Sequence, residues 1–241
     1  MKSLLSLTAG LALATMLAPT AALANGAGNG IVGSPHDFAT DTWNHRGEIC
    51  RVCHVPHDHG KNTGDIGLLW NHQLSSATYL MYAEDTHINF LDSPQQENEP
   101  TGISKLCLGC HDGTVAIDEF DNKVGKTGAG YQTLYITDST IGGGGFTVPR
   151  IANVGADKNL SNTHPISIKY DNVADQGLWN PTTRAMGPVF IVDVLEDGLV
   201  QCSSCHDVHD QEAVANTHLL RVGTTASTGG ASQLCLTCHI K

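Results

Sequence analysis

Eight cysteines occur in this chain of 241 residues, and all of them fall into four copies of one short pattern, Cys-x-x-Cys-His. The copies span residues 50–54, 107–111, 202–206 and 235–239. On a helical turn, positions i, i+3 and i+4 share a face, so the two thiols and the imidazole of one copy point the same way. Two thiols at this spacing can form thioethers to one haem, whose iron the histidine then binds. We therefore predict four c-type haems.

Zinc and disulfide bonds are the other common uses of paired cysteines. Cys-x-x-Cys pairs build tetrahedral zinc sites, and disulfides are frequent in exported chains. Neither explains why a histidine directly follows the second cysteine in every copy. The predicted thioether residues are Cys50, Cys53, Cys107, Cys110, Cys202, Cys205, Cys235 and Cys238. The predicted proximal iron ligands are His54, His111, His206 and His239.

The remaining histidines are the candidates for the second axial position of each iron. Of 13 histidines, nine lie outside the motifs: His36, His45, His57, His59, His72, His87, His164, His209 and His218. Four irons need at most four of them, so every haem could be bis-histidine. Methionine is the alternative axial ligand, and outside the N-terminal segment only Met81 and Met186 could supply it.

His209 follows His206 by three residues, which is too close for it to reach the opposite face of the same haem. It therefore either binds a different iron or is an exposed loop residue. The same two alternatives hold for His57, which follows His54. If each binds a neighbouring iron, the polypeptide cross-links adjacent haems at the short distances that electron tunnelling needs.

Three further histidines have a context that suits a ligand. Pro165 disfavours helical backbone for His164, which leaves that residue extended. His36 follows a flexible start, and His72 lies next to Trp70, which could pack on a haem face. The distal candidates are therefore His57, His209, His164, His36 and His72, of which four are needed.

The N-terminus is expected to direct export. Residues 1–24 combine Lys2, an apolar run and an Ala-x-Ala site, as in a secretory signal peptide. The formal net charge of −11 disfavours nucleic acid and anionic lipid as partners. No later run is apolar enough to span a membrane. We expect residues 25–241 to lie outside the cell or at its surface, with the periplasm as the alternative.

The motifs also indicate the organisation of the chain. A haem pair at 50–111 and a second pair at 202–239 enclose a middle segment, 112–201, within one tetrahaem domain. Glycine is abundant, at 26 residues, and aromatic residues make up only 5%. We expect a haem-dominated fold with low regular secondary structure. Short helices should form at the motifs and a few strands at stretches such as 131–137 and 188–195, with coil elsewhere.

The chain resembles the extracellular multihaem cytochromes that polymerise into conductive filaments, and most of all their tetrahaem type. The strings that carry the resemblance are GSPHDF, CRVCHVPH, LWNH, LCLGCHDGTVA, NTHPIS, CSSCHDVH, LLR and LCLTCHIK. The resemblance implies a continuous stack of bis-histidine haems and a histidine donated to the next subunit, which by motif is His57. A ligand given head-to-tail in this way builds an open polymer.

The favoured function is electron transfer without substrate chemistry, so the protein is not expected to be an enzyme. Its expected partners are further copies of itself, redox cytochromes or extracellular metal acceptors. One alternative is a monomeric periplasmic electron shuttle. The other is a multihaem oxyanion reductase, which would need an iron with a vacant axial position.

Overall fold

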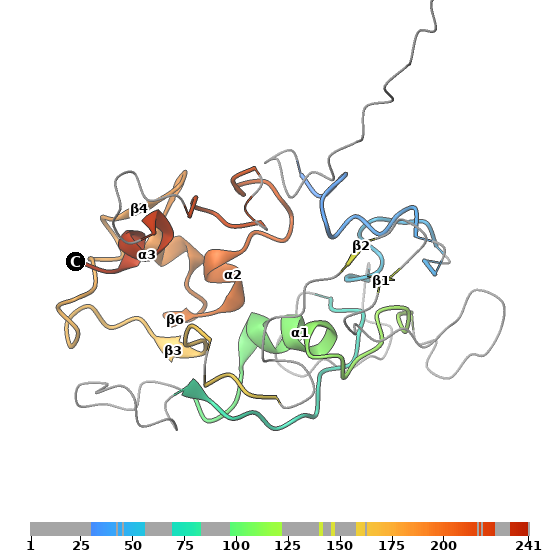
Figure 1. Ribbon diagram of the computed structural model, residues 1–241, viewed down its shortest axis with the longest axis horizontal. Helices are drawn as coiled ribbons and strands as arrows, with labels where there is room; N and C mark the ends of the chain where they lie inside the picture. Colours follow the sequence, from blue (N-terminus) through green and yellow to red (C-terminus); the bar gives the residue numbers. More distant parts are fainter. Residues whose placement is uncertain are drawn as a thin grey trace, which may run out of the picture.

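The computed structural model shows a chain with short helices and strands joined by long stretches of coil (Figure 1). The residues that it describes are 30–41, 43–44, 46–55, 69–82, 97–121, 140–141, 146–147, 158–161, 163–215, 217, 219–224 and 232–240. The expected signal peptide, 1–24, and the expected strand at 131–137 lie outside these residues. Among the described residues, no helix has the length and apolar character needed to cross a membrane.

Three helices lie at three of the four Cys-x-x-Cys-His motifs. They are α1 (Gly102–His111), α2 (Cys202–Cys205) and α3 (Gln233–Cys238). The motif at 50–54, where we expected a fourth helix, forms a single turn instead. In that turn the Cys50 carbonyl accepts hydrogen bonds from the backbone N–H groups of Cys53 and His54, at 3.2 and 2.8 Å.

Within the described part of the chain, the strands form three two-stranded antiparallel sheets. Their pairings are β1 (Thr140–Ile141) with β2 (Phe146–Thr147), β3 (Ile168–Lys169) with β6 (Leu199–Val200), and β4 (Ala185–Met186) with β5 (Val189–Phe190). The strand expected over 188–195 is wrong beyond Phe190, because the chain turns there into the 3-10 helix η3 (Ile191–Val194). The Asp193 carboxylate accepts the Phe190 N–H at 2.9 Å and so stabilises this turn.

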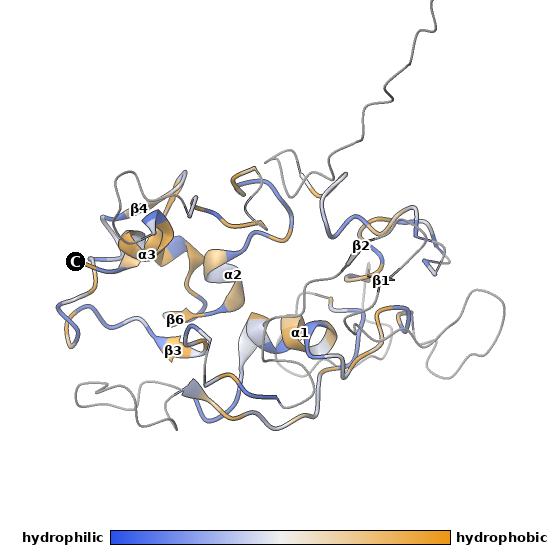
Figure 2. Cartoon of the chain, viewed as in Figure 1, coloured by the Kyte–Doolittle hydropathy of each residue, from blue (hydrophilic) through white to orange (hydrophobic). Residues whose placement is uncertain are grey.

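The buried apolar side chains that the structure describes form three separate clusters, and Figure 2 shows hydrophobic residues in short stretches along the chain. The first is Trp43, Val52, Ile117 and Phe120; the second is Tyr79, Met81, Leu108 and Leu160; the third is Tyr170, Met186 and Ile191. Cys53 and Cys110 pack against the first cluster, and Cys238 packs against the third. The apolar side chains therefore gather around the motifs.

The helices that carry motifs lie in a row across the molecule. Figure 1 shows α3 at one side, then α2, then α1 near the middle, with the blue N-terminal segment toward the other side. A buried polar junction joins α1 to α2. Ser104 Oγ donates to Gln201 Oε1 at 2.5 Å, and the Cys202 N–H donates to Ser104 Oγ at 2.9 Å. The second and third motifs are thereby held against one another.

Candidate haem sites

Each motif places its histidine on the turn that carries its cysteines. The N–H groups of His54, His206 and His239 donate to the carbonyl of the first cysteine of their motif, at 2.8, 3.0 and 2.9 Å. At the latter two, the helix ends and the histidine backbone is extended. His111 differs because it lies within the last turn of α1.

Beyond the turn, β-bridges hold the backbone of three motif histidines. The bridges join His54 to Trp70, His206 to Leu220, and His239 to Leu178. Each partner lies well away from the motif in sequence, so the direction in which the chain leaves the motif depends on tertiary structure. The bridges therefore position the imidazoles in a way that the motif alone does not determine.

Three of the motif histidines lie beside a histidine from elsewhere in the chain. The ring centroids of His36 and His111 are 6.1 Å apart. Those of His54 and His209 are 6.2 Å apart, with the ring planes 23° from parallel. Those of His164 and His239 are 6.3 Å apart. The ring of His209 thus lies beside the histidine of another motif.

This separation matches two imidazoles on opposite sides of one metal ion. A histidine nitrogen lies about 2 Å from the metal that it binds, and about 1 Å separates that nitrogen from its ring centre. Two rings on one axis therefore have centroids about 6 Å apart. Face-to-face or edge contact of two imidazoles allows shorter distances, from about 4.5 Å. The three observed pairs fit a shared iron.

The second ring nitrogen of His164 supports the same assignment, whereas those of His36 and His111 have no such partner in the described part of the chain. Nδ1 of His164 lies 2.9 Å from the Pro165 carbonyl oxygen, to which it can donate. The other nitrogen then keeps its lone pair for a metal, as in many metal-bound histidines. Nδ1 of His36 and of His111 is buried and makes no hydrogen bond with the described residues. Nδ1 of His72 is buried in the same way, and burying such a nitrogen without a hydrogen bond is unfavourable.

Burial keeps the His36 and His111 rings neutral, the state in which imidazole binds metal. Burial, and then the proximity of His111, His206 and His209, lowers the pKa of His36 to about 4. The pKa of His111 is also lowered, first by burial and then by His206, while the Asp112 carboxylate opposes this. Since His206 contributes to lowering the pKa of both rings, it lies near the His36–His111 pair.

The cysteines of consecutive motifs are neighbours. Their sulfur atoms would form the thioethers if haem is attached as predicted. A hydrogen bond with Cys202, followed by burial, raises the pKa of Cys107. Burial, and then Cys53, raises the pKa of Cys110 to about 12. Burial, and then Cys238, raises that of Cys205 to about 12. The contacts thus run from motif to motif in sequence order.

His72, another of the distal candidates, packs against aromatic side chains. His72 is 2% exposed and lies between Trp70, at 5.6 Å between ring centroids, and Phe120, at 6.3 Å. The Trp70 ring thus lies against His72, and its packing on a haem face stays a prediction. His57 lies outside the described residues. The pairs use His36, His209 and His164, so His57 and His72 remain, of the five predicted distal ligands, for the haem predicted at His206.

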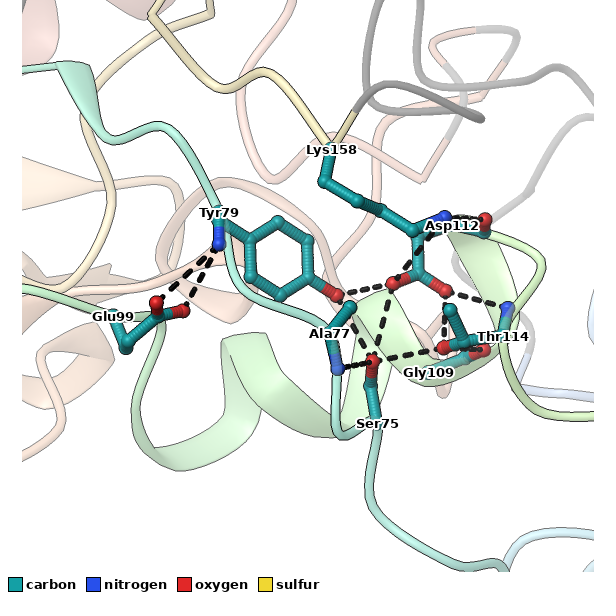
Figure 3. A network of polar contacts seen from close by, with 8 residues as sticks. All are labelled: Ser75, Ala77, Tyr79, Glu99, Gly109, Asp112, Thr114 and Lys158. Atoms are coloured by element: carbon teal, nitrogen blue, oxygen red, sulfur yellow. Dashed lines mark hydrogen bonds and ion pairs between the residues drawn. The ribbon is translucent and has the colours of Figure 1, made fainter.

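Two buried carboxylates near the motifs were not anticipated from the sequence. Asp112 directly follows His111 and lies at the centre of a polar cluster (Figure 3). Asp121 accepts hydrogen bonds from Arg46 Nε at 2.8 Å and from Arg51 Nε at 2.7 Å, and Arg51 belongs to the first motif. The Cys-His-Asp order at 110–112 and 205–207 is visible in the sequence. The residues that hydrogen-bond to Asp112 and Asp121 cannot be identified from the sequence.

No protein-family model and no curated protein matches this chain. The resemblance to filament-forming cytochromes therefore depends on the motifs quoted above, and the candidate sites depend on the histidine and cysteine geometry.

Proposed function

We propose that this chain is a tetrahaem c-type cytochrome that transfers electrons along a row of closely spaced haems. The observation that carries the proposal is the set of three imidazole pairs, each with centroids 6.1–6.3 Å apart. Each pair joins a motif histidine to a histidine from another part of the chain. When bound, each haem supplies an iron that changes its oxidation state by one electron.

The side chains have distinct roles in this proposal. The cysteines tether each haem, and the motif histidine binds its iron from one face. His36, His209 and His164 would each supply a second histidine to one of three haems, and the finer proposal below assigns His57 to the fourth, which would leave no iron open to a substrate. This arrangement favours electron transfer over an oxyanion reductase. The contacts between cysteines of consecutive motifs keep neighbouring haems close, which favours rapid transfer between them.

The finer proposal is that copies of the chain polymerise head-to-tail outside the cell. It rests on the sequence resemblance and on the assignment of the described histidines. The resemblance favours His57 over His72 as the histidine that is given to another subunit, so we assign the iron of His206 to His57. If His57 of one copy binds the iron of a neighbouring copy, the two copies meet through different surfaces. Such a head-to-tail contact produces an open polymer when the rotation between copies does not close.

The experiment that tests electron transfer uses the exported chain, made in cells that attach c-type haem. Intact mass should show four covalently bound haems. The oxidised protein should give a purely low-spin spectrum, and the reduced protein should not bind carbon monoxide. Fewer than four attached haems, or water on several of the irons, would overturn the proposal. Carbon monoxide binding at one haem of the unmodified protein would instead favour the reductase.

A further inference from the structure

Asp112 places a buried negative charge directly beside a proposed iron ligand. It follows His111 at the end of α1, and its side chain is fully buried, with 0% exposure. Its N–H donates to the Leu108 carbonyl at 2.7 Å, which fixes the backbone at the helix end. The carboxylate is therefore held in one position relative to the helical turn of the second motif.

Hydroxyl and N–H donors surround this carboxylate (Figure 3). Oδ1 accepts from the Thr114 N–H at 2.7 Å and from the Thr114 hydroxyl at 2.6 Å. Oδ2 accepts from the Tyr79 hydroxyl and, at 3.3 Å, from Ser75. Neutral donors of this kind orient and stabilise a buried carboxylate without cancelling its charge.

Among the residues that the structure describes, one cation lies next to the carboxylate. Lys158 Nζ is 4.0 Å from Asp112 Oδ2 and donates to the Asp112 carbonyl oxygen at 2.7 Å. The lysine side chain is 19% exposed, so it reaches the buried acid from the edge of the protein. Its position gives the second motif a pair of opposite charges, with the negative member fully buried and the positive member closer to solvent.

We propose that Asp112 and Lys158 set the reduction potential of the iron bound by His111, a role that rests on the proposed function. Reduction adds one electron at the iron, so a nearby buried anion disfavours the reduced state and a nearby cation favours it. The interior of a protein screens such effects weakly. Asp112 therefore lowers the potential of this haem, and Lys158 partly offsets that effect.

The comparable acid in the third motif has a different environment. Asp207 also follows its motif histidine, but it accepts from the backbone N–H groups of His209, Gln211 and Glu212, at 3.1, 2.7 and 2.7 Å. Among the described residues, it forms no ion pair with lysine or arginine. Removing the Lys158 charge should therefore affect the haem of the second motif and leave that of the third unchanged.

The test compares two substitutions that change charge in opposite directions. At one fixed pH, spectroelectrochemical titration of the haem-loaded protein should show Asp112→Asn raising one of the four midpoint potentials and Lys158→Gln lowering the same one. A tenfold change in the ratio of reduced to oxidised haem, about 59 mV for one electron, is the expected scale for Asp112→Asn. The shift for Lys158→Gln should be smaller, because that side chain is nearer to solvent.

Ser75→Ala is the matched control, because it removes a hydroxyl from the same cluster without changing charge. It should leave the potentials close to those of the unmodified protein. An upward shift in Ser75→Ala equal to that in Asp112→Asn would assign the effect to packing and overturn the proposal. Shifts of the same sign in both charge variants, or none in either, would also overturn it.

Haem counting on the same samples separates the two proposals. Fewer than four haems in the unmodified protein would contradict the proposed function. Four haems with unaltered potentials would contradict only the role of Asp112 and Lys158. If Asp112→Asn fails to mature, the sign of the Lys158→Gln shift decides, since loss of the cation should make reduction harder.

Discussion

The imidazole rings of His54 and His209 lie 6.2 Å apart between centroids, with planes only 23° from parallel. One belongs to the first motif and the other follows the third, so their proximity ties the two halves of the chain together. If the pair shares an iron, the haem tethered by Cys50 and Cys53 is also held by the segment that carries the third haem.

The first prediction follows from this pair. His209→Ala should open one axial position on the haem of the first motif while all four haems remain covalently attached. The reduced variant should then bind carbon monoxide at one haem in four, and its oxidised spectrum should gain a high-spin component. His87→Ala, which alters a histidine outside the candidate set, should do neither. A fully low-spin His209→Ala variant that excludes carbon monoxide would show that His209 is not a ligand.

The second prediction concerns Asp121, which joins the first motif to the residues around Asn71. Burial alone would raise the pKa of Asp121, but hydrogen bonds from Arg51, Asn71 and Arg46 outweigh it and lower the pKa from 3.8 to about 2. Because the folded pKa is the lower one, the contribution to stability is present above about pH 4 and is lost as the pH falls toward 2. It amounts to about 2 kcal/mol.

Asp121→Asn should therefore lower the free energy of unfolding at pH 7 by about 2 kcal/mol. The difference from the unmodified protein should shrink as the pH is lowered from 4 to 2. Denaturant unfolding of both proteins at several pH values measures this. Asp197→Asn is a suitable control, because Asp197 is an exposed carboxylate. A constant difference across this pH range would contradict the assignment.

The third prediction tests the junction between the second and third motifs. Gln201 Oε1 accepts from Ser104 Oγ at 2.5 Å and from Ser167 Oγ at 3.1 Å, and all three residues are buried. Gln201→Leu would leave both hydroxyls without this acceptor, at a cost of about 2–3 kcal/mol in the free energy of unfolding. Thr182→Ala, at an exposed Asn180 contact, should cost less than about 0.5 kcal/mol. Equal effects would show that the junction does not hold the motifs together.

How much of this could be predicted from the sequence differs between parts of the site. The cysteines and motif histidines follow from covalent chemistry at fixed spacing. Of the five distal candidates, three lie beside a motif histidine in the structure. Which motif each one joins could not be predicted, because the pairing depends on tertiary contacts such as the His54–Trp70 bridge.

The errors and omissions have similar causes. The apolar run at 188–195 favours a strand, but the Asp193 side chain competes for the Phe190 N–H and the chain turns into η3. The acid after His111 is visible in the sequence, whereas its partners Tyr79 and Lys158 come from distant segments. A side chain that competes for a backbone N–H, or a polar contact between distant segments, leaves no periodic pattern in the sequence. Such features therefore cannot be predicted from residue spacing.

The last prediction tests the polymer. His57→Ala should leave four attached haems but remove the ligand that we assign to the iron of His206 in the neighbouring copy. The variant should then be monomeric by light scattering, should show no fibres in electron micrographs, and should bind carbon monoxide at one haem when reduced. His59→Ala changes a histidine two residues away and should keep the fibres. If the unmodified protein is itself monomeric, the chain is a shuttle; if His57→Ala still forms fibres, another residue joins the subunits. Adding free imidazole to the variant should restore the low-spin spectrum without restoring the fibres, because it fills the iron site without linking two chains.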